Sequence, residues 1–205
     1  MKIFKRCLML AASWCLATPL HAADAGVLVA ARERLALEPV TQGEFVQTRQ
    51  LARIKKPLIS TGRFVVARGL GVIWEDIAPF ARTMRLTKDE ILQTADGQTL
   101  MHLSADKEPA VAAVTGILFG VLAGDLDALA RGFDHAGEVK GTHWRLDFTP
   151  RDANLARLIR QLTLRGARDI EQVEIISAAG DVTYIEFKAQ THAREIPADI
   201  GKRFE

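Results

Sequence analysis

The sequence predicts a mainly β (α+β) protein in which one long antiparallel sheet is accompanied by an N-terminal helix and an apolar helical insert. Short runs of alternating apolar and polar residues follow one another at residues 43–105 and again at 137–193, as strands do. Turn residues such as Asp96-Gly97 separate these runs, so neighbouring strands should connect locally instead of through crossover helices. Between the two groups of strands lies a segment of helical composition, residues 108–133.

The size and composition of the chain fit one globular domain. Of the 205 residues, 48% are hydrophobic, which is enough to bury a substantial core. The sequence has no internal repeat, no low-complexity linker and no shift in composition that would indicate a second domain.

Residues 1–23 have the layout of a secretory signal peptide, with a basic start, an apolar run and small residues at the end. A membrane anchor is the weaker alternative, because the apolar run is shorter than the ~20 residues that a span needs. Cleavage after Ala22 or Ala23 would leave residues 24–205 as a single domain. The basic residues of the leader are Lys2, Lys5 and Arg6.

Loss of this leader would change the charge and the thiol content of the chain. It removes three positive charges and no negative ones, so the formal net charge falls from +2 to −1. No basic run remains to indicate a nucleic-acid partner. Both cysteines, Cys7 and Cys15, also leave, so the exported domain can fold in an oxidising compartment without disulfide chemistry.

The elements follow in order along the chain. A first helix is expected from Asp24 to Leu37, where apolar residues recur near helical spacing, and Pro39 ends it. A short helix or turn is expected at 151–159, directly after Pro150. The expected strands lie within 43–54, 60–68, 71–77, 83–89, 90–96, 98–105, 137–150, 160–166, 170–180 and 181–193.

The helical insert is predicted to form two helices. Pro109 suits a first turn, and residues 110–123 are apolar on almost every face. Gly124 breaks this helix, and Asp125 is expected to cap the next one with Asp127 near its positive end, a simpler interpretation than a catalytic carboxylate pair. A helix that is apolar on all sides must be covered, so it is either an ordinary core helix, which periodicity alone favours, or a mobile lid.

The sequence shows no set of residues that would carry catalysis or hold a metal ion or cofactor. The histidines beyond the leader are dispersed and have no acidic residue at metal-ligand spacing. A serine nucleophile is imaginable at Ser104, beside His102 on one strand face, but there is no nucleophile elbow and no assignable acid. We therefore expect a binding protein, not an enzyme. The dispersed histidines are His102, His135, His143 and His192.

The segment Gly62 to Trp74 raises a different question. Residues two apart in a strand share a face, so Phe64, Val66 and Arg68 should point the same way. Taken alone, Arg68 is most simply a strand-end charge that reaches solvent, and the aromatic residues of the segment are most simply core.

From Phe45 to about Ala189, the chain resembles the LolA outer-membrane lipoprotein carriers and their LolA-like relatives of Gram-negative bacteria. Each motif alone is weak, but their order and spacing behind a signal peptide are fairly specific. The motifs are "FVQ" in the first strand, Gly62-x-Phe64-x-x-x-Arg68, Trp74, Pro79, Asp96-Gly97 with Thr99-Leu100, the helical insert, and "WRLDFTP" from Trp144 to Pro150.

The resemblance implies a strongly curved, unclosed antiparallel β-barrel, or half-barrel, with helices forming a lid over an apolar cavity. It also implies a periplasmic carrier that binds the acyl chains of a lipoprotein or lipid and shuttles them from the inner to the outer membrane. Its donor would be an inner-membrane transporter of the ABC or RND/MMPL type, and its receiver an outer-membrane acceptor. The carrier would be a monomer. The competing hypothesis is a periplasmic adaptor module of an envelope export complex.

The resemblance also implies roles for particular residues. Arg68 matches an arginine that, in the family, contacts backbone carbonyls of the lid helix and helps to hold the empty cavity shut. In LolA a proline follows this arginine, whereas Gly69 follows it here. The chain looks more like the LolA-like branch associated with RND/MMPL exporters. The implied lipid-binding residues are Phe64, Val66, Val72, Trp74, Val114, Ile117, Leu118, Phe119 and Leu122.

Overall fold

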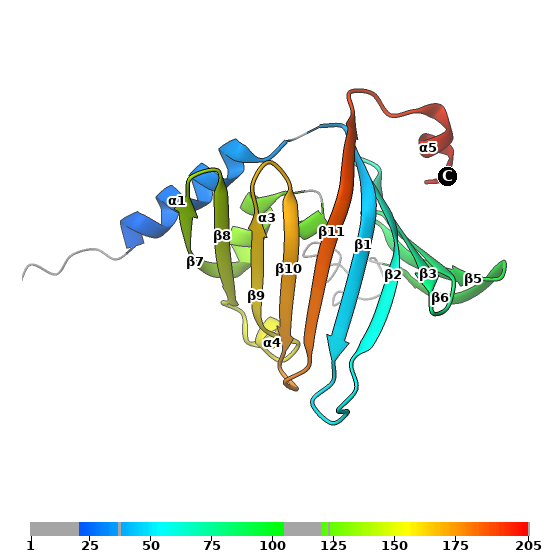
Figure 1. Ribbon diagram of the computed structural model, residues 1–205, viewed down its shortest axis with the longest axis horizontal. Coiled ribbons are helices and arrows are strands. Elements are labelled where there is room, and N and C mark those ends of the chain that lie inside the picture. Colours follow the sequence, from blue (N-terminus) through cyan, green and yellow to red (C-terminus); the bar gives the residue numbers. More distant parts are fainter. Residues whose placement is uncertain (1–20, 37, 105–119, 123, 205) are drawn as a thin grey trace, which may run out of the picture.

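The computed structural model describes residues 21–36, 38–104, 120–122 and 124–204. Within these ranges, eleven strands form one antiparallel sheet in the order β6-β5-β4-β3-β2-β1-β11-β10-β9-β8-β7 (Figure 1). The expected mainly β class with an open antiparallel sheet is confirmed. The strands are β1 (Val40–Gln50), β2 (Leu58–Ala67), β3 (Gly71–Ala78), β4 (Arg82–Leu86), β5 (Glu90–Ala95), β6 (Gln98–Ser104), β7 (Phe133–Lys140), β8 (His143–Pro150), β9 (Ile159–Gly166), β10 (Ile170–Ser177) and β11 (Val182–Ala193).

The two halves of the chain each form a meander, and they meet at the centre of the sheet, where β1 pairs with β11. The two edges are β6 and β7, which do not pair with each other within the described residues. In sequence, these edge strands flank the insert, so the insert links the two open edges of the curved sheet.

Helices complete the described part of the chain: α1 (His21–Arg34), α3 (Leu126–Gly132), α4 (Ala153–Ala156) and α5 (Ala198–Lys202). Gly120–Leu122 are also helical. The last three positions of the predicted leader belong to the start of α1, and the rest of the leader lies outside the described residues. No described helix has both the length and the apolar character needed to cross a membrane.

Some predicted boundaries were wrong. The first helix occupies His21–Arg34 instead of ending at Leu37. The insert was expected to stay helical to Phe133, but this residue begins β7, where it pairs with Pro150 of β8. The helix α5 was not expected at all. The prediction of a second insert helix capped by Asp125 is confirmed, because the Asp125 carboxylate accepts a hydrogen bond from the Ala128 N–H at 2.8 Å.

Alternation along the strands divides the core between the two faces of the sheet. In β2, Phe64 and Val66 belong to the main cluster, whereas Val65 and Ala67 belong to a smaller cluster on the opposite face. We call the face with the main cluster the concave face, because residues from strands across the whole sheet converge there with residues of α1 and α3. Figure 1 shows α3 behind the sheet, inside its curve.

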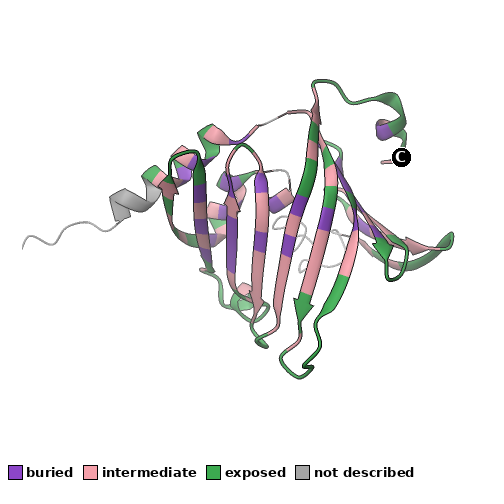
Figure 2. Ribbon diagram, in the orientation of Figure 1, coloured by how far each residue is buried: buried purple, intermediate pink, exposed green. Residues whose placement is uncertain are grey.

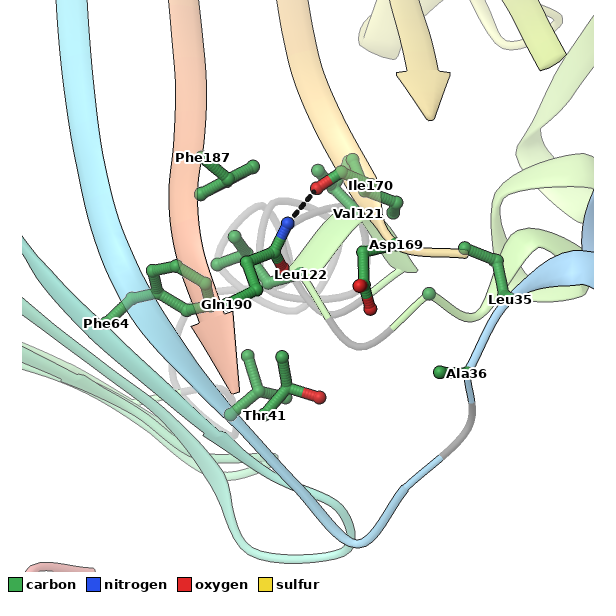
Figure 3. Close-up of a pocket in the computed structure, with 12 residues that line it drawn as sticks. Leu35, Ala36, Thr41, Phe64, Val121, Leu122, Asp169, Ile170, Phe187 and Gln190 are labelled. Atoms are coloured by element: carbon green, nitrogen blue, oxygen red, sulfur yellow. Dashed lines mark hydrogen bonds between the residues drawn. The ribbon is translucent and has the colours of Figure 1, made fainter. Parts of the chain in front are cut away.

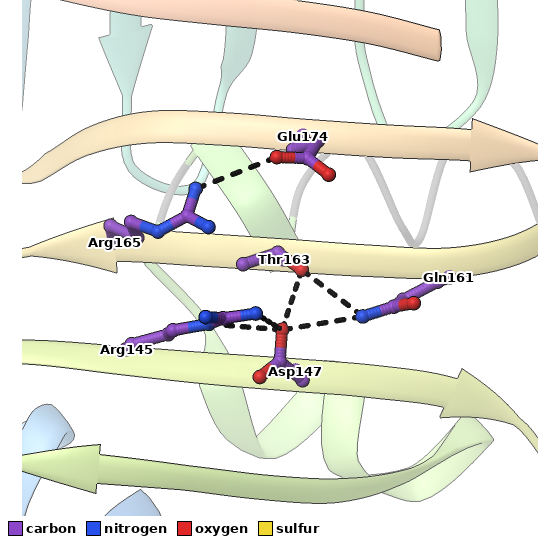
Figure 4. Close-up of polar contacts among 6 residues, drawn as sticks. All are labelled: Arg145, Asp147, Gln161, Thr163, Arg165 and Glu174. Atoms are coloured by element: carbon purple, nitrogen blue, oxygen red, sulfur yellow. Dashed lines mark hydrogen bonds and ion pairs between the residues drawn. The ribbon is translucent and has the colours of Figure 1, made fainter. Parts of the chain in front are cut away.

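The convex face is polar over β8 to β10 (Figure 4). Asp147 lies between two fully buried residues of the concave face and points the opposite way. Its carboxylate accepts hydrogen bonds from Thr163 Oγ1 at 2.6 Å, from Arg145 Nη2 at 3.0 Å and from Gln161 Nε2 at 3.4 Å. These contacts join β8 to β9 through polar side chains.

Over β1 to β3, the convex face is instead covered by α5. Ile200 of this helix packs with Val40, Val65 and Ile73 in the smaller cluster. The Arg203 guanidinium just after α5 forms an ion pair with Glu75 of β3 at 2.6 Å.

Candidate functional site

Four aromatic side chains from the central strands meet on the concave face. Phe45 of β1 stacks on Trp74 of β3 with ring centroids 3.8 Å apart. Phe187 of β11 approaches Trp74 edge-on at 6.2 Å and Phe64 of β2 edge-on at 4.9 Å. Such offset and edge contacts are the favourable geometries for aromatic pairs. The cluster gives the centre of the sheet a wide apolar surface.

Two strand glycines make room for these rings. Gly62 lies directly opposite Phe45 and Gly43 directly opposite Phe64 in the β1–β2 pairing. A Cβ at Gly62 would lie 2.6 Å from Phe45 Cζ, and one at Gly43 would lie 3.0 Å from Phe64 Cε1. Each glycine therefore allows an aromatic ring to lie flat across the neighbouring strand.

Helices α1 and α3 pack on the same concave face, at its β7–β8 end. Leu28 and Ala31 of α1, Leu35 directly after it, and Leu126 and Leu129 of α3 are buried in the same cluster as the aromatic residues. At the solvent side, Arg32 of α1 and Asp127 of α3 form an exposed ion pair at 3.0 Å. We call α1, α3 and residues 120–122 the cover.

Beneath the cover a small cavity remains (Figure 3). Its volume is about 30 Å³, more than the ~10–15 Å³ that a single water molecule needs by this measure. Gln190 of β11 closes one side by donating a hydrogen bond to the Ile170 carbonyl at 2.9 Å. Val121 and Leu122 of the cover line the cavity together with Phe64 and Val66. At this site, apolar side chains of residues 121–122 pack against apolar side chains of the sheet.

The structure brings several of the predicted lipid-binding residues together. Phe64, Val66, Val72 and Trp74 are buried in the main cluster, and Leu122 packs against it. The remaining four lie outside the described residues: Val114, Ile117, Leu118 and Phe119.

Arg68 lies just past the end of β2, beside the cover. Its Nε donates a hydrogen bond to the Glu38 carbonyl at 3.0 Å, and its side chain lines a cavity of about 480 Å³ with Gly124 and Asp125. Burial lowers the pKa of the Arg68 guanidinium, and the nearby Asp125 carboxylate partly opposes this shift. The position next to the start of α3 fits the predicted latch, and a bond to lid carbonyls stays a prediction.

Sequence reasoning missed part of the site. Phe187 and Gln190 of β11 were not predicted as site residues, although Phe187 follows the alternation of its strand. Beside the cavity, His192 bridges Asp169 Oδ1 at 3.1 Å and Thr41 Oγ1 at 3.1 Å. This cross-link holds the β9–β10 turn to β11 and β1, and no sequence motif predicts it.

The serine and histidine considered for catalysis lie at the open edge of the sheet. His102 Nε2 contacts Glu90 Oε2 at 2.6 Å, and the other oxygen of Glu90 is held by Arg85 at 2.8 Å. These hydrogen bonds, the one from His102 first, lower the pKa of the Glu90 carboxyl despite a smaller opposing effect of burial. The arrangement is that of an ion-pair network. The described residues include no group of three or more side chains that could hold a metal ion.

The described residues thus form an open, curved sheet with helices packed against its apolar concave face. The chain belongs to the family described as outer membrane lipoprotein carrier protein LolA-like, whose model matches residues 17–196. The resemblance seen in the sequence is thereby confirmed. Among curated proteins, none matches the sequence.

Solved structures with a similar fold share little sequence with the chain. A LolA superfamily protein from Nitrosomonas europaea is 11% identical, with a TM-score of 0.46 over 87% of this chain and 96% of that one. A DUF1329 family protein from Desulfovibrio piger is 9% identical, with a TM-score of 0.49 over 91% and 97%. A putative outer membrane lipoprotein-sorting protein domain from Vibrio parahaemolyticus is 9% identical, with a TM-score of 0.46 over 88% and 97%.

Proposed function

We propose that the protein is a periplasmic carrier that binds the acyl chains of a lipoprotein or lipid on its concave face and shuttles them from the inner to the outer membrane. In this proposal residues 1–23 are removed on export, and residues 24–205 form one carrier domain with a lid at about residues 108–133. An inner-membrane transporter of the ABC or RND/MMPL type supplies the cargo, and an outer-membrane acceptor receives it.

The observation that carries the proposal is the aromatic concave face under its cover of separate helices. A 16-carbon acyl chain exposed to water costs on the order of 12 kcal/mol, at ~0.8 kcal/mol per CH2 group. A carrier must offer comparable apolar surface and must still release its cargo. If the cargo takes the place of the cover, one apolar contact replaces another and the net affinity stays moderate.

The proposal is tested by the uptake of a fluorescent fatty-acid analogue. The two valines Val65 and Val66 are adjacent in β2, both buried, and point to opposite faces. Val66→Thr adds a hydroxyl where the acyl chain would lie, which should weaken probe binding about 5- to 150-fold at 1–3 kcal/mol per buried hydroxyl. Val65→Thr adds the same group under α5 and should leave probe binding unchanged.

The competing adaptor hypothesis makes a different prediction. An adaptor would capture its partner without any lipid, take up no probe, and carry no lipid through purification. Absence of probe uptake and of co-purified lipid in the wild-type protein would exclude the carrier function. An equal loss of binding in both threonine variants would indicate a general stability effect instead of a cargo site.

Arg68 offers a separate test of the opening and closing cycle. Arg68→Leu should keep the fold and impair transfer, so that cargo is retained or is not passed on. Transfer at the wild-type rate in this variant would remove the latch from the mechanism and leave Arg68 as a structural residue that binds the Glu38 carbonyl.

A further inference from the structure

The β1–β2 end of the sheet exposes apolar side chains to solvent. Figure 2 shows exposed residues at the lower tips of these strands. We call this surface the docking rim: residues 49–59, which span the β1–β2 loop, and residues 77–82, which span the β3–β4 turn. Its large apolar residues and their exposed fractions are Ile54 47%, Leu58 52%, Ile59 57%, Ile77 54% and Phe80 76%. Clustered exposure of this kind marks an interaction surface.

A groove runs between the two parts of the rim. It has a volume of about 230 Å³, and Leu58 and Ile59 line it from β2, with Pro79 and Phe80 opposite. The groove also continues the concave face toward the rim. Its wall residue Asp76 follows Trp74 by two positions on β3 and therefore lies on the same face.

Positive charge surrounds these apolar residues. Between residues 49 and 56 the chain carries Arg49, Arg53, Lys55 and Lys56 and no acidic residue. No ion pair of these four side chains is found in the part of the chain that the structure describes.

The acidic groups that face the rim are already engaged. Asp76 is held by Arg82 at 2.6 Å, and Asp181 accepts a hydrogen bond from the Ala52 N–H at 2.9 Å. The rim therefore carries a surplus of positive charge.

The loop that presents this charge is held in shape by hydrogen bonds. Gln50 Nε2 donates to the Ile54 carbonyl at 2.7 Å, and the Ile54 N–H donates to the Leu51 carbonyl at 3.1 Å. The contact from Asp181 ties the same loop to the neighbouring β10–β11 turn. A preformed loop loses little conformational entropy on docking.

We propose that the docking rim seats on the surface of an anionic phospholipid membrane. Apolar side chains such as Phe80 and Ile54 enter at headgroup depth, and the basic side chains contact lipid phosphates. Apolar residues flanked by lysine and arginine suit this interface, since the buried apolar area and the attraction to anionic lipid add together. Seated in this way, the protein turns the lower end of its concave face toward the membrane.

The experiment measures binding of the purified protein to vesicles by sedimentation, without any acyl probe. Vesicles of phosphatidylethanolamine with phosphatidylglycerol should bind the protein, and vesicles of phosphatidylcholine alone should bind it far less. The triple variant Arg53→Gln, Lys55→Gln, Lys56→Gln should bind about a hundredfold more weakly, and added salt should reduce wild-type binding. Phe80→Ser should weaken binding about tenfold, and it should fold, because Phe80 is the most exposed of these apolar residues.

The matched controls lie at the other end of the strands. Lys88→Gln, Lys140→Gln and Lys202→Gln together remove the same charge from exposed positions away from the rim, and Ile196→Ser removes an exposed apolar residue; both variants should bind as the wild type does. Absence of vesicle binding, equal binding to both lipid mixtures, or equal effects of rim and control variants would each overturn the proposal. Binding of a protein partner to the rim, without binding to vesicles, would also overturn the proposal. Acyl-probe uptake is measured separately, so the carrier function and the membrane contact can fail independently.

Discussion

The two faces of the sheet are built from the same strands but are stabilised in different ways. On the concave face, aromatic rings of the central strands share one core with helices from distant parts of the sequence. On the convex face, β8 and β9 are joined by hydrogen bonds from Thr163 and Gln161 of β9 to Asp147 of β8, groups that the strands themselves carry. The concave face packs against helices, whereas over β8 and β9 the convex face is stabilised by polar contacts between its own strands.

This difference bears on function. Contacts between strand residues form whenever the strands pair, and they cannot be exchanged without breaking the sheet. In the proposed carrier, contacts between the sheet and the cover are exchanged for contacts with the cargo, and only the cover has to move. On the proposed function, changes on the concave face should therefore alter both stability and probe binding, whereas changes on the convex face should alter stability alone.

The largest expected effect is at the centre of the concave face. Trp74→Ala removes the ring that stacks on Phe45 and contacts Phe64 and Phe187, and it should lower the free energy of unfolding by about 3–5 kcal/mol. Urea denaturation measures this loss. The same variant should take up less acyl probe at temperatures where it remains folded, since the surface for the acyl chain is reduced. A loss under about 1 kcal/mol would show that the cluster contributes no more than surface residues do.

A smaller effect is expected under α5. Ile200→Ala removes a buried side chain from the small convex cluster, and it should lower the free energy of unfolding by about 2 kcal/mol. Probe uptake should stay at the wild-type level, because no concave residue is touched. Reduced probe affinity in this variant would contradict the separation of the two faces.

The polar network of the convex face should contribute less again. Burial alone would raise the pKa of the Asp147 carboxyl, but hydrogen bonds from Thr163 and Arg145 outweigh it and lower that pKa. Asp147→Asn should therefore lower the free energy of unfolding by about 1–2 kcal/mol at neutral pH. Because its pKa is lowered in the folded state, the ionised Asp147 carboxylate stabilises the fold at pH values above the ordinary aspartate pKa of about 3.9. This stabilisation is lost as the pH falls through the folded-state pKa.

The pH profile of this difference is the decisive measurement. Wild type and Asp147→Asn should differ by a constant amount between about pH 5 and 7, and the difference should shrink below about pH 4. A difference that grows at low pH would mean that the carboxylate is destabilised in the folded state. Asp134, which forms an exposed ion pair with Arg151, gives a matched control: Asp134→Asn should change stability far less.

Much of the fold was predictable because strands and turns leave local signals. The alternation of Trp144, Leu146 and Phe148 identified β8 and its buried face, and Asp96-Gly97 identified the β5–β6 hairpin. Local sequence does not predict the pairing of β1 with β11, which joins the first strand to the last. The curvature of the sheet was likewise known only from the family resemblance.

The candidate site was only partly predictable, for a physical reason. Phe64 and Trp74 lie opposite each other in one hairpin, and the family resemblance assigned both to the site. Phe45 and Phe187 complete the cluster from β1 and β11, and Gly43 makes space for a ring on the next strand. Long-range pairing decides such contacts. The boundary error at Phe133 has a related cause, because its pairing with β8 overrides the helical pattern before it.

The smallest expected effects compare α5 on the convex face with the cover on the concave face. Arg203→Gln removes the ion pair that ties the end of α5 to Glu75, and Arg32→Gln removes the one that ties α1 to Asp127 of α3. Each pair is partly exposed, so each variant should lower the free energy of unfolding by less than about 1 kcal/mol.

The two variants should nevertheless differ in the kinetics of probe uptake. Arg32 links two parts of the cover that must separate from the sheet when cargo enters, so Arg32→Gln should speed probe association measured by stopped-flow fluorescence. Arg203→Gln acts on the convex face and should leave that rate unchanged. If both variants, or neither, changed the rate, the cover would not open by parting α1 from α3, and the exchange of cover for cargo would have to proceed through another segment.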